Sequence, residues 1–175
     1  MKKLCILFAL LPILLAAVLI GVQRPAAEQA AYLRLHVRAN SDAAEDQAVK
    51  YAVKEAVVAY LAPLAAECGS KEEALLLVRG ELGAVEAAAE AALQENGFSY
   101  GVRASLRQEE FPARVYEGVT LEAGVYDALI VELGTGAGAN WWCVIYPPLC
   151  FAGDAAVDVE VRSKLWELVQ KFFGN

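Results

Sequence analysis

The chain has one histidine, His36, in 175 residues, and this shortage limits the metal and catalytic chemistry that it can support. Zinc sites usually combine several histidine and cysteine ligands, and the sequence lacks the Cys-x-x-Cys spacing that often supplies them. A cysteine nucleophile would have to take its base from this single imidazole. We therefore expect no metal site and no catalytic residue. The alternative is a nucleophilic pair of His36 with Cys143 or Cys150.

The Gly-Lys-Ser/Thr ending of a phosphate-binding loop is missing as well. Residues 134–139, GTGAGA, loosely match the G-x-G-x-x-A pattern of dinucleotide-binding proteins, which requires a helix N-terminus immediately afterwards. The residues that follow, NWWCVIYPP, have the character of a strand and then a turn. We expect no cofactor and no small-molecule substrate, and we predict that these glycines form a hairpin connection with positive φ.

Basic side chains are scarce relative to acidic ones, with 15 Lys and Arg against 22 Asp and Glu and a formal net charge of −7. Two of the basic residues, Lys2 and Lys3, stand at the N-terminus, so the rest of the chain is more acidic still. Nucleic acids bind surfaces that carry an excess of positive charge. The composition therefore argues against a nucleic-acid partner.

The first 25 residues have the pattern of an export signal. Lys2 and Lys3 precede an uncharged apolar run, Leu4 to Val22, that is close to the roughly 20 residues needed to span a bilayer. A good Ala-x-Ala cleavage site is hard to place, so a cleaved signal peptide and an uncleaved membrane anchor both stay open. Basic residues beside a membrane segment usually stay in the cytoplasm, so we expect Lys2 and Lys3 on that side and the residues after about Val22 outside. We expect a linker at residues 26–31 and one extracytoplasmic domain over residues 32–175.

The segment YLRLHVRA, residues 32–39, alternates strictly between apolar and polar side chains, which predicts a half-buried strand. Tyr32, Arg34, His36 and Arg38 share one side of this strand. Because three of the four carry polar or charged groups, we expect this side to face solvent or a partner protein.

Two long helices are predicted next. The first begins with Asp42 in a capping-box-like position and runs to about Ala62, where Pro63 ends it. The second begins at the cap residue Ser70 and ends at Asn96.

After the helices, apolar side chains again recur at every second residue, which predicts strands. Grouped strands after grouped helices favour an α+β fold with a mostly antiparallel sheet, packed with the two long helices and a C-terminal helix. The predicted strands are Tyr100 to Leu106, Arg114 to Tyr116, Val125 to Leu133 and Trp141 to Tyr146, and the last helix is Asp158 to Phe173.

Adjacent tryptophans in the last predicted strand make both of its faces apolar. Trp141, Cys143 and Ile145 should point to one side, and Trp142, Val144 and Tyr146 to the other. Aromatic residues in strands usually fill cores, so core packing is the expected role, and a contact surface is the alternative.

Outside the leader the chain has three cysteines, Cys68, Cys143 and Cys150. A Cys143–Cys150 disulfide is geometrically possible only if the chain reverses at Pro147-Pro148. Export would permit the bond. A bridge and two buried thiols are equally compatible with the sequence, which assigns no role to Cys68.

Several stretches together resemble the stage II sporulation protein R family of endospore-forming Firmicutes: LRLHVRANSDAAEDQAVK, FPARVY, LEAGVYDALIVELG and NWWCVIYPPLCF. The resemblance implies a noncatalytic protein that is exported from the forespore into the space between the two sporulation membranes. There it would activate a membrane-embedded aspartic protease, which processes the pro-sigma factor of the mother cell. The residues that carry the resemblance are His36, Asn40, Ser41, Asp42, Glu45, Asp46, Gln47, Asn140, Trp141, Trp142, Cys143, Pro147, Pro148, Leu149, Cys150 and Phe151.

The predicted partner-binding surface combines the polar strand side with its neighbours: Arg34, His36, Arg38, Asn40, Asp42 and Trp142. Two other classes of function remain as alternatives. One is a cell-wall hydrolase or transferase with Cys143 or Cys150 as nucleophile and His36 as base. The other is a wall-glycan binding module that uses the tryptophans.

Overall fold

The computed structural model of the chain describes residues 29–116 and 119–148. The predicted leader and the predicted C-terminal helix lie outside these residues, and the division into residues 1–25, 26–31 and 32–175 stays a prediction.

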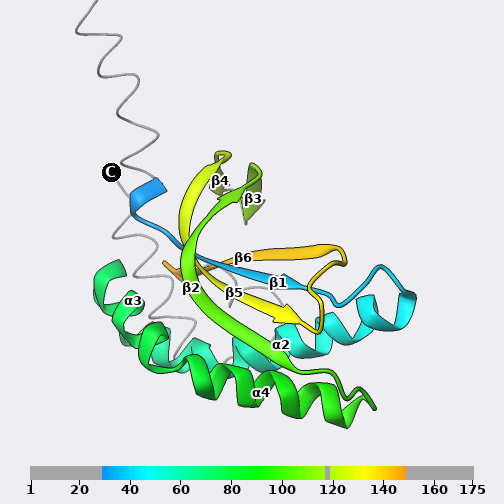
Figure 1. Cartoon of the computed structure of the whole chain (residues 1–175). Helices are drawn as coiled ribbons and strands as arrows, with labels where there is room; N and C mark the ends of the chain where they lie inside the picture. The colour runs from blue at the N-terminus through cyan, green and yellow to red at the C-terminus, as the bar shows by residue number, and fades with distance from the viewer. Residues whose placement is uncertain (1–28, 117–118, 149–175) are drawn as a thin grey trace, which may run out of the picture.

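A four-stranded sheet with the order β2-β5-β1-β6 forms the centre of the molecule (Figure 1). β1 pairs in parallel with β5, whereas the β1–β6 and β2–β5 pairings are antiparallel. The predicted α+β class with a mostly antiparallel sheet is therefore confirmed. The strands are β1 (Leu33–Arg38), β2 (Val102–Phe111), β5 (Gly124–Leu133) and β6 (Asn140–Tyr146).

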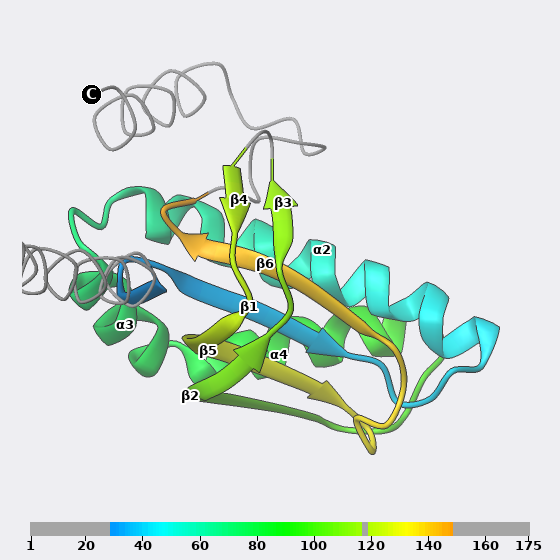
Figure 2. The ribbon, with the colours of Figure 1, turned by 90° about the horizontal axis from the view of Figure 1, so that it is seen from above.

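Helices cover one face of this sheet (Figure 2). They are α2 (Ala44–Ala66), α3 (Lys71–Gly80) and α4 (Leu82–Glu95). The apolar side of β1 packs beneath them, and Leu33, Leu35 and Val37 are all at most 1% exposed. We call the cluster that they form with the helices the helix-side core. No helix within residues 29–116 and 119–148 is both long and apolar enough to cross a membrane.

The opposite face is covered by a small two-stranded sheet, β3 (Arg114–Tyr116) and β4 (Val119–Leu121), which stands above the main sheet in Figures 1 and 2. A second apolar cluster lies between them. We call it the second-face core; its buried members are Tyr32, Phe111, Leu121, Tyr126, Ala128, Ile130 and Val144. The sequence predicts β3 at its observed bounds, but β4 was not expected.

Both helix predictions need correction, the first at its C-terminal end and the second in its middle. α2 continues through Pro63 to Ala66, because Ala65 at 1% exposure is buried in the helix-side core and this packing outweighs one lost backbone hydrogen bond. The second predicted helix is two helices, α3 and α4, interrupted at Glu81 between two glycines. The predicted cap is confirmed, since the Ser70 hydroxyl accepts a hydrogen bond from the backbone N–H of Glu73.

The glycines of residues 134–138 adopt the predicted positive φ at Gly134 (56°) and Gly136 (63°). They do not form a hairpin, because β1 lies between β5 and β6 in the sheet. The loop instead passes over the end of β1 and packs against residues 39–42, where the backbone N–H of Gly138 donates to the carbonyl of Ala39.

The face assignment in β6 is correct except for Tyr146, which joins the helix-side core instead of the second-face core. The β1–β6 register shifts at Leu33/Arg34, where Leu33 pairs with Tyr146 and Arg34 with Val144. This irregularity places one extra residue in β6, which turns the following side chain to the other face.

Candidate functional site

Arg34 lies fully buried between the main sheet and the β3–β4 sheet. Its Nε donates to the Cys143 carbonyl at 3.0 Å and its Nη2 to the Tyr116 hydroxyl at 2.8 Å. The guanidinium carbon is 4.4 Å from the ring centroid of Phe111, 4.9 Å from that of Tyr126 and 5.4 Å from that of Tyr116. Burial lowers the pKa of Arg34, and Tyr116 partly opposes this effect. Arginine nevertheless keeps its charge in proteins, so this is a caged cation.

His36 is the next residue on the same strand side and is 3% exposed. Its ring stacks on Trp142 at 5.5 Å and meets the edge of Phe111 at 5.8 Å. Nδ1 is 2.8 Å from Glu109 Oε1. Burial lowers the pKa of His36 despite the opposing influence of Asn140 and Glu109. The imidazole is therefore neutral near pH 7, and Nδ1–H donates to the Glu109 carboxylate.

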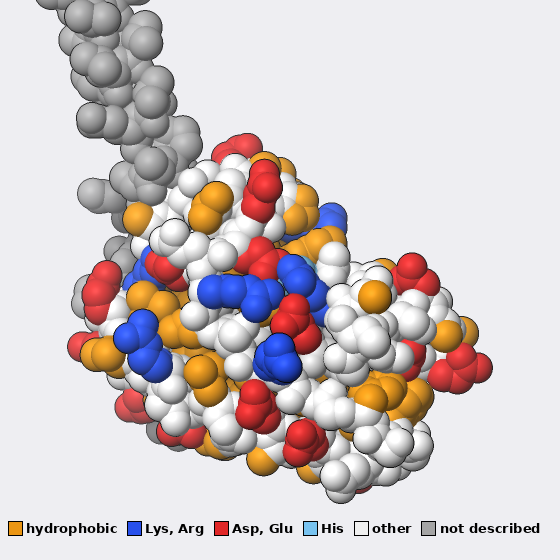
Figure 3. Space-filling view, viewed as in Figure 1, with side chains coloured by type: hydrophobic (Ala, Val, Ile, Leu, Met, Phe, Trp, Pro, Cys, Tyr) orange, Lys and Arg blue, Asp and Glu red, His pale blue; other side chains and the backbone are white. Residues whose placement is uncertain are grey.

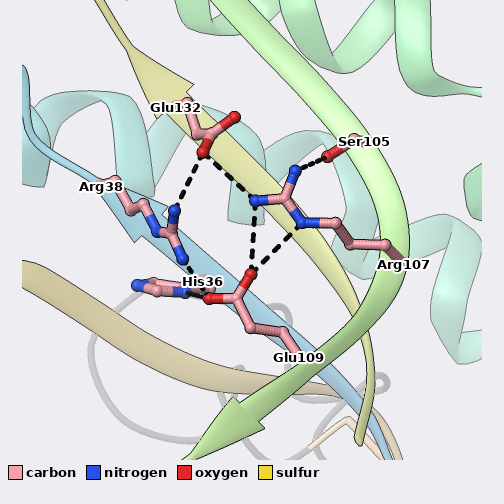
Figure 4. Close-up of polar contacts among 6 residues, drawn as sticks. All are labelled: His36, Arg38, Ser105, Arg107, Glu109 and Glu132. Carbon is pink, nitrogen blue, oxygen red and sulfur yellow. Dashed lines mark hydrogen bonds and ion pairs between the residues drawn. The ribbon is translucent and has the colours of Figure 1, made fainter. Parts of the chain in front are cut away.

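Beside His36, an ion network of two arginines and two glutamates extends across three strands (Figure 4). Arg38 contacts Glu109 and donates to Glu132 at 3.0 Å. Arg107 reaches the same two carboxylates at 3.3 and 3.2 Å. Burial alone would raise the pKa of Glu109, but His36 and Arg38 outweigh burial and hold that pKa below its ordinary value. Figure 3 shows basic and acidic side chains side by side below the β3–β4 sheet.

The expectation that the polar side of β1 is open is wrong for Arg34 and His36. The second-face core and the β3–β4 sheet cover this side, and Arg38, at 27% side-chain exposure, is its accessible end. Strand pairing places an acidic residue next to Arg38. Arg38 pairs with Glu132 of β5, and Glu132 pairs on its other side with Arg103 of β2. Glu109 and Glu132 were not singled out from the sequence, because their positions beside β1 depend on pairing between distant segments.

Asn40 and Asp42 lie at the end of β1, where their side chains hold the 134–139 loop. Asn40 Oδ1 accepts from the backbone N–H of Thr135 at 3.0 Å, and Asp42 Oδ1 accepts from that of Ala139 at 2.7 Å. The predicted capping role of Asp42 is wrong, because Ala43 occupies the N-cap position of α2 and makes no side-chain cap.

Asp46 lies beneath this corner and is 6% exposed. It accepts hydrogen bonds from Ser41 Oγ at 2.5 Å, Tyr100 Oη at 2.8 Å and Asn40 Nδ2 at 2.9 Å. The Ser41 hydroxyl is the main cause of the lowered pKa of Asp46, against the effect of burial. The polar residues 40–42, which we call the NSD segment, thus order the chain at the end of β1 through internal hydrogen bonds.

Two of the stretches that carry the family resemblance, LRLHVRANSDAAEDQAVK and NWWCVIYPPLCF, meet in space. β1 of the first stretch pairs along its length with β6 of the second. A family model described as Stage II sporulation protein R (spore_II_R) matches residues 29–156. The chain belongs to this family. It is 32% identical over 161 residues to Stage II sporulation protein R of Bacillus subtilis (strain 168), and the match covers 86% of this chain and 72% of that protein. No solved structure shows a significant match.

In this member of the stage II sporulation protein R family, the tryptophans of β6 are half-buried and do not lie fully inside a core. Trp142 packs against the second-face core with His36 on one side, and the Arg114 guanidinium lies 4.6 Å from its ring centroid. Trp141 packs on the helix-side core, with Lys54 Nζ 5.4 Å from its ring. Trp142 and Arg38 are therefore the members of the predicted binding surface that have both exposure and no role in holding the 134–139 loop.

Cys143 is disulfide-bonded, and its partner lies outside the described residues, as does Cys150. The Cys143–Cys150 pairing therefore stays a prediction. Cys143 belongs to the helix-side core, whereas His36 faces the second-face core. A Cys143–His36 catalytic pair is not formed, because the sheet separates the two side chains. Cys68 is a free, half-buried thiol, and burial raises its pKa. The described residues contain no metal-binding cluster of His, Cys, Asp and Glu.

The burial of the only histidine predicts a specific acid sensitivity. Because the pKa of His36 is lowered in the fold, stability is complete above its unfolded value of about 6.5 and declines as the pH falls below it. The decline should reach up to about 1 kcal/mol per pH unit between roughly pH 6.5 and 5. Urea unfolding at several pH values measures it.

His36→Gln should flatten this slope, because glutamine does not titrate. The carboxylates with lowered pKa values, Asp46, Glu109 and Asp127, lose their stabilising effect only at lower pH. An unchanged slope in the variant would show that another group is responsible.

Proposed function

We propose that this chain is an exported, noncatalytic signalling protein that activates a membrane-embedded aspartic protease by binding to it. The protease then processes the pro-sigma factor of the mother cell. Membership in the stage II sporulation protein R family carries this proposal. The separation of Cys143 from His36 by the sheet supports a binding role over a Cys143-dependent enzyme.

The proposed location is the extracytoplasmic side of the membrane, in the space between the forespore and mother-cell membranes. The basic residues Lys2 and Lys3 followed by an apolar run support export. The folded domain would contact the extracytoplasmic part of the protease through Trp142, Arg38 and the adjoining β3–β4 sheet. Arg and Trp are favoured anchors in protein interfaces.

Reconstitution tests this proposal. The protease and the pro-sigma factor are produced in a non-sporulating host with or without this protein, and pro-sequence removal is followed by the change in sigma-factor mass. We expect processing only when the complete chain is present. A version that begins at residue 32, and so stays in the cytoplasm, should not support processing. Equal processing without this protein would refute the proposed activation.

A further inference from the structure

Arg34 is a buried cation without a carboxylate partner among the described residues. It is fully inaccessible, and its hydrogen bonds go to the Cys143 carbonyl and the Tyr116 hydroxyl, while the Tyr126 hydroxyl also favours its charged form. Its Nη1 has no hydrogen-bond acceptor within residues 29–116 and 119–148. Lys71, which is also buried, shows the usual arrangement, because its Nζ lies 2.6 Å from the Asp127 carboxylate. The aromatic cage of Arg34 compensates its charge only in part, since a buried charge normally needs an opposite charge.

The unsatisfied edge of Arg34 has the geometry of a carboxylate receptor. A guanidinium binds a carboxylate through two parallel N–H groups. Here no described residue accepts a hydrogen bond from Nη1, and Nη2 donates to the hydroxyl of Tyr116, a neutral and weaker acceptor than a carboxylate. Tyr116 is half-buried at the end of β3 and belongs to a separate two-stranded sheet. It is the least buried of the three rings, since Phe111 and Tyr126 are 1% and 2% exposed.

A second arginine, Arg114, lies near Tyr116. Arg114 lies two residues from Tyr116 on β3, and it makes no ion pair within the described ranges. In a chain with a net charge of −7, the exposed Arg114 near the buried Arg34, neither with an acidic partner among the described residues, gives this place a positive charge that complements an acidic protein segment.

We propose that Arg34 receives an aspartate or glutamate carboxylate of the partner protease, which displaces the Tyr116 hydroxyl. This inference rests on the proposed function and names the contact that would carry it. In the free protein Tyr116 occupies the receptor, so binding has to overcome one hydrogen bond. Removing that hydroxyl therefore strengthens binding, whereas a purely structural Tyr116 would weaken the protein when changed.

Tyr116→Phe is the decisive variant in the processing assay. It keeps the ring of the cage and removes only the competing acceptor, so the half-activating concentration should fall about threefold, the worth of one neutral hydrogen bond. Tyr51→Phe is the matched control, because Tyr51 is 50% exposed and also lies beside a cation, Lys50. Its dose dependence should equal that of the unchanged chain. A half-activating concentration for Tyr116→Phe that is unchanged or higher overturns the proposal.

A binding test without the protease separates this inference from the proposed function. Sodium acetate serves as the carboxylate probe, with sodium chloride at equal ionic strength as the reference. Acetate should raise the thermal midpoint of Tyr116→Phe more than that of the unchanged chain, and the gain should disappear in the double variant Arg34→Lys/Tyr116→Phe. If acetate has the same effect on all three proteins, Arg34 is not a carboxylate receptor. If acetate acts as expected but processing never occurs, the receptor stands and the assigned protease partner is wrong.

Discussion

Arg34→Ala is expected to lower the free energy of unfolding by about 3–5 kcal/mol, the range for truncating a large buried side chain. The change removes the guanidinium from between the rings of Phe111, Tyr116 and Tyr126 and leaves a cavity there. It also leaves the Cys143 carbonyl without this donor. The thermal midpoint should fall by roughly 10 °C or more. Calorimetry or urea unfolding measures the effect.

Arg79→Ala is the matched control, since Arg79 is exposed on α3 and should change stability by less than about 0.5 kcal/mol. Arg34→Met separates shape from charge, because methionine fills part of the cavity without a cation. We expect its stability to lie between those of the unchanged chain and Arg34→Ala. A midpoint for Arg34→Ala within one or two degrees of the control would contradict the caged arrangement. From the sequence, in contrast, an exposed Arg34 would be nearly neutral to stability.

Gly138→Ala should destabilise the protein by about 2–3 kcal/mol, a cost typical of forcing atoms into a packed site. A Cβ at this position would lie 2.2 Å from the Ser41 carbonyl oxygen, and backbone atoms cannot move aside as a flexible side chain does. The 134–139 loop would have to separate from residues 39–42. That separation also weakens the hydrogen bonds of Asn40 and Asp42 to Thr135 and Ala139.

The control for this change is Gly83→Ala, in the first turns of α4. A Cβ there meets no atom within 4 Å, and alanine is the better helix former, so stability should rise by up to about 1 kcal/mol. Opposite signs for two identical substitutions would support the observed packing of the loop. Hydrogen exchange at Thr135 and Ala139 should increase in Gly138→Ala. Unchanged exchange and an unchanged midpoint would contradict the close contact with Ser41.

Local patterns were sufficient for several elements. The alternation of residues 32–39 correctly separates Leu33, Leu35 and Val37 from Arg34 and His36, because neighbouring side chains of a strand point to opposite faces. The Ser70 cap and the bounds of β3 were also correct, since both depend on residues close in the chain. The interruption at Glu81 was missed because helical spacing continues through both helices.

The environment of the polar strand side could not be predicted in the same way. Polar character is usually a sign of exposure, but Tyr116, Phe111 and Tyr126 close over Arg34 from segments 77 or more positions further along the chain. The carboxylate that contacts His36 likewise comes from a distant strand, 73 positions away. Asn40 and Asp42 were expected on a binding surface, yet they hold residues of the 134–139 loop.

By itself, the sequence determined the fold class, the family, the faces of β1 and the positive-φ glycines. Each of these depends on local spacing, residue type or a linear motif. Only the tertiary structure decided that Arg34 is caged, that His36 lies on the opposite side of the sheet from Cys143, and that the NSD segment holds a loop. These features depend on which distant strands pair and in which register. Pairing follows from the burial of the whole sheet, and no single segment encodes it.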